Sequence, residues 1–340
     1  MYIRRKQQNR KMLQAVCAMT LLLVMIITPC TQVYAASDQT SEGLNYYNKV
    51  SEYHEELAWV EKNEKLGCID TNGELVVPCR YDGAKNFSDG MAAVMKGGMW
   101  GYIDKKGKQV VKYKYDEAYN YREDMAVVKK GDKYGYVNKK GKEIVKCKYD
   151  YARDYSEGLA VVKKGDKYGY IDKKGKEIIT CKYDDAYNFS EGLAIVGKNG
   201  KYSIFDMKYG YINKKGKEVV TCKYDDAYNF SEGLAAVEKN DKYGYINKKG
   251  KEVITCKYDK VGNYSEGLAI VRKNGKYGYL DKKGKEVIEC QYDAAGAFYN
   301  GRALIRQNGS CSVIDKSGKT ITECGDELKE QFGDVYLAGI

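Results

Sequence analysis

The chain has 340 residues, among them 34 tyrosines, 36 glycines, two prolines and one histidine, and its formal net charge is +11. The single histidine, His54, leaves too few imidazoles for a histidine-based zinc site or for most acid–base catalysis. Tyrosine and glycine at this density are typical of many short strands joined by tight turns.

Residues 1–35 have the pattern of a secretory signal peptide. A basic start is followed by an apolar run from Ala15 to Thr28, and Val33 and Ala35 fit the −3 and −1 positions of a cleavage site. The run is shorter than the roughly 20 residues that span a bilayer, although a retained membrane anchor stays open as the alternative. Cleavage after Ala35 predicts a mildly basic, secreted or cell-surface protein with no further membrane span.

After a linking segment at 36–52, one unit of about 34 residues is repeated eight times. The segment from residue 155 reads YSEGLAVVKKGDKYGYIDKKGKEIITCKYDDAYN, and the segment from residue 264 reads YSEGLAIVRKNGKYGYLDKKGKEVIECQYDAAGA. One copy is longer, because Lys201–Asp206 imitates the strand motif that follows it. The predicted repeats are 53–86, 87–120, 121–154, 155–188, 189–229, 230–263, 264–297 and 298–331, and a tail follows at 332–340.

Each repeat predicts three or four short strands. The run LAVV, the alternating KYGYID and the run KEVIT are the clear strands, and a Tyr-Asp-x-Ala segment leads to the next copy. The glycine of the D-K-K-G-K turn is expected to have a positive φ. A constant alanine in LAVV and a constant glycine in KYGYID indicate close approach by a neighbouring backbone or ring, or a bulge at the glycine.

These motifs resemble those of the bacterial WG-repeat family. The residues that carry the resemblance are Trp100-Gly101-Tyr102-Ile103-Asp104, the flanking F/Y-S-E-G-L-A and K-x-G-K-x-V-I motifs, and the Y-D pair, over about residues 53–331. The resemblance implies a β-rich extracellular or surface repeat protein and no particular chemistry. The chain departs from the family in having cysteine where proline is usual before the Y-D pair; Pro78 alone survives.

The predicted fold is all-β, with eight tandem β-meander repeats in a propeller-like arrangement. An open β-solenoid or superhelical array is the alternative, because the linking motif recurs in degenerate form at both ends of the repeats.

Two columns of the repeat are candidate ligand-binding surfaces. An aromatic column could stack on sugar rings, although packing between repeats accounts for it as well. Lysines in the turns could bind an anionic cell-wall glycan, or could be solvated charges that protect strand edges. The aromatic column is Trp100, Tyr134, Tyr168, Tyr209, Tyr243 and Tyr277, and the turn lysines are Lys140, Lys174, Lys215, Lys249 and Lys283.

Nine cysteines follow the predicted signal peptide, and seven of them share one column of the repeat. Without a CxxC motif they are expected to be small buried hydrophobes and not metal ligands. Cys311 and Cys324 are the candidate disulfide. A two-residue turn at Ser317-Gly318 would place them opposite each other, whereas a three-residue loop with a glycine bulge would put Cys311 opposite Glu323.

No Ser-His-Asp set, phosphate-binding loop or metal-ligand spacing is present in the sequence. We therefore expect no enzyme activity, cofactor or metal. The predicted function is an exported scaffold for an unknown protein partner, and the alternative is a module that binds cell-envelope glycan or teichoic acid. Nucleic acid is not an expected partner of an exported protein.

Overall fold

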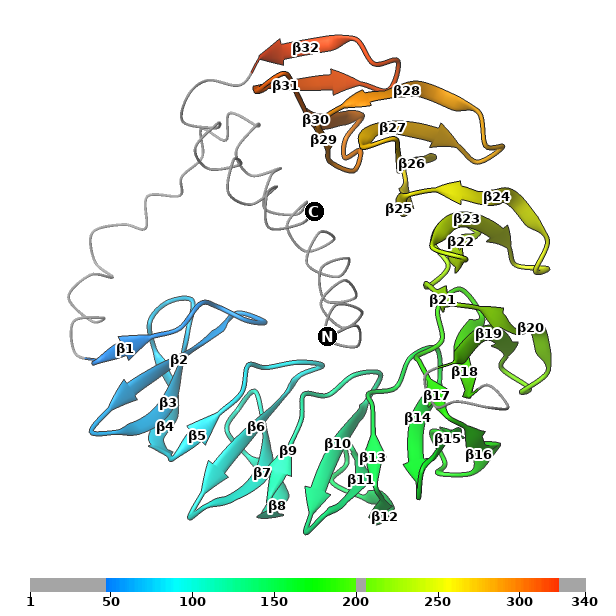
Figure 1. The fold of residues 1–340 in the computed structure, drawn as a ribbon. Coiled ribbons are helices and arrows are strands. Elements are labelled where there is room, and N and C mark those ends of the chain that lie inside the picture. The colour runs from blue at the N-terminus through cyan, green and yellow to red at the C-terminus, as the bar shows by residue number, and fades with distance from the viewer. Residues whose placement is uncertain (1–46, 200–205, 324–340) are drawn as a thin grey trace. The chain divides into compact units, whose positions relative to one another are not determined.

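A computed structural model of the chain describes residues 47–199 and 206–323. Within these ranges the chain forms eight four-stranded antiparallel sheets, one after another along the sequence (Figure 1). A four-stranded antiparallel sheet of this kind is the building block of β-propellers. The prediction of an all-β tandem repeat with propeller-like sheets is therefore confirmed.

The first four sheets are formed by strands that follow each other in sequence order. Their bounds are β1 (Lys49–Val50), β2 (Leu57–Lys62), β3 (Lys65–Asp70) and β4 (Leu75–Tyr81); β5 (Gly83–Ala84), β6 (Met91–Lys96), β7 (Met99–Asp104) and β8 (Gln109–Tyr115); β9 (Glu117–Ala118), β10 (Met125–Lys130), β11 (Lys133–Asn138) and β12 (Glu143–Tyr149); β13 (Tyr151–Ala152), β14 (Leu159–Lys164), β15 (Lys167–Asp172) and β16 (Glu177–Tyr183).

The last four sheets repeat the same order. Their bounds are β17 (Asp185–Ala186), β18 (Leu193–Asn199), β19 (Met207–Asn213) and β20 (Glu218–Tyr224); β21 (Asp226–Ala227), β22 (Leu234–Lys239), β23 (Lys242–Asn247) and β24 (Glu252–Tyr258); β25 (Lys260–Ser265), β26 (Leu268–Lys273), β27 (Lys276–Asp281) and β28 (Glu286–Tyr292); β29 (Ala294–Ala295), β30 (Arg302–Gln307), β31 (Ser310–Asp315) and β32 (Thr320–Glu323).

The first strand of each sheet comes from the linking Tyr-Asp-x-Ala segment. In the third sheet, β9 pairs with β10 through Ala118 and Val128. A sheet therefore begins about four residues before the corresponding predicted repeat, and the linking segment is the fourth strand that the repeat pattern left open. In the same way Lys49–Val50, from the predicted linking segment at 36–52, forms β1.

Two compact units divide the chain. The N-terminal unit contains the described part of Gln32–Lys198 together with Ile212–Lys217, and the C-terminal unit contains Asn199–Tyr211 and the described residues from Glu218 onward. The predicted signal peptide, residues 36–46, most of the Lys201–Asp206 duplication and the tail at 332–340 lie outside the described residues.

The hydrophobic core lies between neighbouring sheets of a unit. One cluster combines Val127 and Tyr136 of the third sheet with Ala160 and Val162 of the fourth. Ala160 belongs to the column of constant alanines and is completely buried in this cluster. An alanine suits this position because the tyrosine ring of the preceding sheet fills the space beside it, as the sequence predicts for a close neighbour.

Candidate functional site

The D-K-K-G-K turns are three-residue loops closed by the aspartate that precedes them. At one such turn the Gly107 amide donates to the Asp104 carbonyl at 2.9 Å, and the Asp104 amide donates to the Lys108 carbonyl at 3.0 Å. The Asp104 carboxylate also accepts the backbone amides of Lys106 and Lys108. Gly107 has φ +74°, so the predicted positive φ is confirmed.

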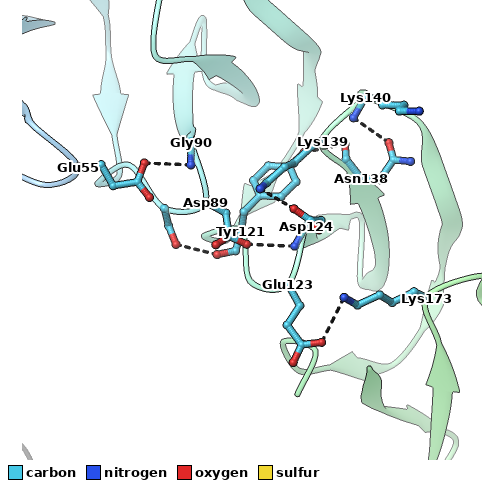
Figure 2. Close-up of polar contacts among 11 residues, drawn as sticks. Glu55, Asp89, Gly90, Tyr121, Glu123, Asp124, Asn138, Lys139, Lys140 and Lys173 are labelled. Carbon is cyan, nitrogen blue, oxygen red and sulfur yellow. Dashed lines mark hydrogen bonds and ion pairs between the residues drawn. The ribbon is translucent and has the colours of Figure 1, made fainter. Parts of the chain in front are cut away.

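At five of the turns the first lysine helps to clamp two consecutive repeats together. Glu123 accepts the backbone amide of Gly158 at 2.9 Å and forms an ion pair with Lys173 at 3.3 Å. Glu55 accepts the amide of Gly90 in the same way (Figure 2). The acidic residue of the S-E-G motif therefore binds the next repeat at two points. Equivalent ion pairs join Glu55 to Lys105, Glu157 to Lys214, Glu232 to Lys282 and Glu266 to Lys316.

One clamp differs from the others in two residues. Asp89 replaces glutamate and accepts the backbone amide of Asp124 at 3.0 Å. The first lysine of the corresponding turn, Lys139, then pairs with Asp124 at 2.5 Å (Figure 2). Lys139 therefore pairs within its own repeat, with the aspartate that stands where other copies have the glycine of S-E-G, and the Asp89 hydrogen bond joins the two repeats.

The second lysine of each turn is left for solvent or a partner. The backbone amide of Lys140 donates to the Asn138 side chain, while its own side chain is exposed. Within residues 47–199 and 206–323, no carboxylate forms an ion pair with the second lysines, whereas the first lysines are engaged. The second lysines are Lys106 and the five predicted turn lysines, Lys140, Lys174 and Lys215 in the N-terminal unit and Lys249 and Lys283 in the C-terminal unit.

The aromatic column lies on the third strand of each sheet. Tyr134 of β11 stands opposite Lys129 of β10, which in turn stands opposite Glu117 of β9. The Lys129 ammonium lies 5.6 Å from the centre of the Tyr134 ring. A cation over the ring face is a favourable contact, and it leaves less of that face open to a sugar.

The other members of the aromatic column have similar surroundings. Each lies beside side chains of its own or a neighbouring sheet. The contacts are Lys85 with Trp100 at 5.5 Å, Lys163 with Tyr168 at 5.4 Å, Arg272 with the buried Tyr277 at 5.4 Å, and the hydroxyl of Tyr243 donating to Glu238 at 3.1 Å. Tyr209 lies half-buried on β19.

A second set of tyrosines, on the same strands, holds the sheets of each unit together. The Tyr136 hydroxyl donates to the carbonyl oxygen of Arg153 at 2.7 Å, across to the following sheet. Each of these hydroxyls binds a carbonyl at the equivalent position of the next sheet, just after its short first strand or, for Gly262, within the longer β25. The framework tyrosines, with their acceptors, are Tyr102 with Tyr119, Tyr136 with Arg153, Tyr170 with Tyr187, Tyr211 with Tyr228, Tyr245 with Gly262 and Tyr279 with Gly296.

The acceptor position of these bonds is one that sequence reasoning missed. Its side chain changes from copy to copy, being Lys85, Tyr119, Arg153 and Tyr187 in the second to fifth sheets, whereas the residue before each of these four is alanine. The signal was present in the sequence as variation at a fixed place in an otherwise regular repeat. The constant columns of the repeat indicate the fold, whereas this variable column indicates where the copies differ.

The column of cysteines is structural in character. The Cys256 thiol donates to the Val237 carbonyl at 3.7 Å, and burial raises the pKa of Cys256 to about 11. Cys147 makes the same contact with Val128 at 3.8 Å, and burial likewise raises its pKa. Because the thiolate is the reactive form, these thiols are poor nucleophiles and metal ligands at neutral pH.

The last hairpin combines features of both predicted turns. The Gly318 amide donates to the Asp315 carbonyl at 2.9 Å, as in a three-residue loop with a glycine bulge. A register shift then pairs Ser312 with Glu323, which is the pairing expected from a two-residue turn. Cys311 is buried, and Cys324 lies outside the described residues, so the disulfide stays a prediction.

Neither a metal-binding group nor a membrane-spanning helix was found in the described ranges. No group of three or more histidine, cysteine, aspartate or glutamate side chains there is arranged to hold a metal ion. No helix of the described part of the chain is long and apolar enough to cross a bilayer.

Comparison with known proteins identifies the repeat. The WG containing repeat matches seven times, at residues 67–100, 100–134, 134–168, 168–202, 209–243, 243–277 and 277–311. No curated protein matches the sequence.

Several solved structures have a similar backbone. A crystal structure of the eukaryotic initiation factor has a TM-score of 0.48 at 10% identity, covering 79% of this chain and 84% of the other. Hsv2 of Kluyvelomyces marxianus has a TM-score of 0.34 at 10% identity, covering 82% and 94%. PorZ, a surface component of the type-IX secretion system of Porphyromonas gingivalis, has a TM-score of 0.29 at 10% identity, covering 81% and 44%.

Proposed function

We propose, from the premise that this chain belongs to the WG containing repeat family, that it is a non-enzymatic scaffold that binds other proteins. One observation carries the proposal. The constant polar side chains hold the repeats together, while the side chains after the first strands, such as Lys85 and Arg153, differ from sheet to sheet. A regular framework with variable side chains at one fixed place suits recognition better than catalysis, which needs a single specialised constellation.

The exposed turn lysines support a second candidate function, the binding of an anionic cell-envelope glycan such as teichoic acid. Lys140 and Lys174 project from equivalent turns and have no ion-pair partner within the described residues. Binding through such exposed charges would weaken as salt screens them.

A binding experiment separates the two functions. The purified chain is mixed with peptidoglycan, with and without teichoic acid, and in parallel with envelope proteins under a reversible crosslinker. A protein scaffold should crosslink to defined proteins at about 0.15 M salt and sediment with neither glycan. Salt-sensitive sedimentation that requires teichoic acid, and that is lost when Lys140 and Lys174 are changed to glutamine, would instead establish the glycan function.

Export is a further part of the proposal and has its own test. If residues 1–35 are a signal peptide, protein recovered from the medium or the cell surface should begin at Ala36 or within about two residues of it. N-terminal sequencing of that material is the measurement. A mature form that still contains the apolar run from Leu21 to Ile27 would contradict the prediction.

A further inference from the structure

A continuous strip of cationic and aromatic side chains crosses the second to fifth sheets of the N-terminal unit. The Lys85 ammonium lies 4.6 Å from the centre of the Tyr119 ring, and the Tyr119 hydroxyl donates to Glu117 at 2.7 Å. Glu117 also binds Lys129, which covers Tyr134. This half of the strip therefore runs from Lys85 to Tyr134 without a break.

The strip continues on the next two sheets through Tyr151. The Tyr151 ring lies 5.9 Å from the Tyr134 ring, and the guanidinium carbon of Arg153 lies 5.8 Å from the Tyr151 ring and 5.1 Å from the Tyr187 ring. Tyr151 is 37% exposed, so the strip reaches the surface here. We call the set of Lys85, Glu117, Tyr119, Lys129, Tyr134, Tyr151, Arg153 and Tyr187 the cation–aromatic strip.

Two cations of the strip have no ion-pair partner. Within the described residues neither Lys85 nor Arg153 forms an ion pair, and the Arg153 Nε is buried without a hydrogen-bond partner. The neighbouring Arg122 is exposed and likewise forms no ion pair there. Other lysines nearby behave differently, since Lys129 of the strip and Lys173 of a turn each bind a carboxylate.

Hydrogen bonds from the preceding sheet hold the backbone of the strip in place. The Trp59 indole donates to the Lys85 carbonyl at 3.1 Å, and the Tyr136 hydroxyl donates to the Arg153 carbonyl at 2.7 Å. The two residues that bring the unpaired charges are therefore held by buried donors of the preceding sheet. Such preorganisation lowers the entropic cost of binding a partner.

Two acidic side chains limit what the strip can bind. Asp154 is half-buried, and burial raises its pKa while Arg122 and Lys85 oppose the shift. Burial lowers the pKa of Lys85, against the attraction of Glu117 and Asp154. Carboxylates this close to the cations would repel a uniformly anionic polymer, but they can accept the backbone amides of a peptide.

We propose that the cation–aromatic strip, together with Arg122, binds an extended acidic segment of a partner protein. This inference rests on the proposed scaffold function. The guanidinium of Arg153 lies between two aromatic rings, and its planar fork suits a carboxylate. The ammonium of Lys85 meets a second carboxylate, and Glu117 and Asp154 accept amides of the bound segment.

The test uses the full-length chain and two blocked synthetic peptides in which every second residue is glutamate in one and glutamine in the other. Binding is followed by calorimetry and by fluorescence, because the chain has two tryptophans, Trp59 and Trp100, and both contact Lys85. We expect the glutamate peptide to bind about tenfold more tightly than the glutamine peptide, and to change the fluorescence.

Variants locate the binding site. Arg153→Gln and Lys85→Met should each weaken binding of the glutamate peptide about tenfold. Arg153→Lys should lose less affinity than Arg153→Gln, because lysine keeps the positive charge but lacks the planar, bidentate guanidinium. The matched control removes one positive charge elsewhere in the same unit, as Lys140→Gln or Lys174→Gln, and should change the affinity less than about twofold. Circular dichroism checks that each variant is folded.

Three results would overturn the inference. These are equal affinity for the two peptides, equal losses in the strip and turn-lysine variants, or tighter binding of polyphosphate or polygalacturonate than of the glutamate peptide. The scaffold proposal can survive each of them. If a protein captured by crosslinking is retained by Lys85→Met and Arg153→Gln, the strip is not its site, whereas failure to crosslink any protein would remove the scaffold proposal itself.

Discussion

Replacing Tyr170 by alanine is expected to lower the free energy of unfolding by about 3–5 kcal/mol. Tyr170 is completely buried, and its ring meets the Phe189 ring edge-on at 5.0 Å. Its hydroxyl donates to the Tyr187 carbonyl at 2.7 Å. Truncation therefore leaves a cavity between two sheets and removes the donor that pins the next sheet's first strand.

Conservative variants divide this loss between packing and hydrogen bonding. Tyr170→Phe keeps the ring and should cost about 1–3 kcal/mol, because the Tyr187 carbonyl loses a buried donor. Tyr151→Phe is the control: Tyr151 is exposed, no hydrogen bond of its hydroxyl is seen within the described residues, and the change should stay within about 0.5 kcal/mol. Urea unfolding gives the midpoint and the slope for each variant.

The slope of the urea transition has a separate meaning in a repeat protein. Each sheet packs mainly on its neighbours, so losing one contact can uncouple the sheets on either side. A lower slope in Tyr170→Ala would show that the unit no longer unfolds as a whole. An alanine variant as stable as Tyr151→Phe would show that the framework tyrosine does not hold the sheets together.

The regular parts of the fold could be predicted from the sequence because their causes are local. The positive φ of Gly107 follows from a three-residue loop, and the three main strands follow from runs of apolar or alternating residues. The first strand, as in Tyr151–Ala152, is only two residues long and gains its partner from the following copy. A segment this short has no periodicity of its own, so the repeat pattern places it at the end of the preceding copy.

The candidate sites were harder to predict because they depend on pairing between repeats. Lys173 and Lys174 are neighbours in one turn, yet Lys173 pairs with Glu123, while Lys174 forms no ion pair within the described residues. Nothing in the dipeptide distinguishes them; the difference arises from the acidic residue of the preceding repeat. The surroundings of Arg153 also depend on a neighbouring repeat, because its two ring partners, Tyr151 and Tyr187, belong to different sheets.

The strand glycines could be predicted as places of close approach, and the structure supplies the reason. Tyr243 pairs with Tyr258 and Tyr245 pairs with Ile254, so Gly244 lies opposite a bulge in β24. The last copy has Ser312 at this position, paired with Glu323, and the residues that follow Glu323 lie outside the described part of the chain.

Gly244→Ala is accordingly expected to destabilise the C-terminal unit by at least about 1–3 kcal/mol. A Cβ at Gly244 would lie 2.4 Å from the Ile254 carbonyl oxygen and 2.7 Å from the Cys256 amide nitrogen. Both atoms belong to the backbone of β24, so relief requires the bulge itself to move. Thermal unfolding should show a fall in Tm of several degrees, at roughly 2–4 °C per kcal/mol for a domain of about 150–250 residues.

The matched control is Gly262→Ala, in the same unit. The nearest atom to a Cβ there is the Ile270 Cβ at 3.6 Å, an ordinary contact, and Gly262 does not have a positive φ. This variant should be neutral or stabilising by up to about 1 kcal/mol, because alanine restricts the unfolded chain. If both variants have the same Tm as the parent, β24 can move away at no cost, and the close backbone contact is not what requires glycine. A loss confined to Gly244→Ala would identify the bulge over the glycine as the constraint that requires glycine at this position.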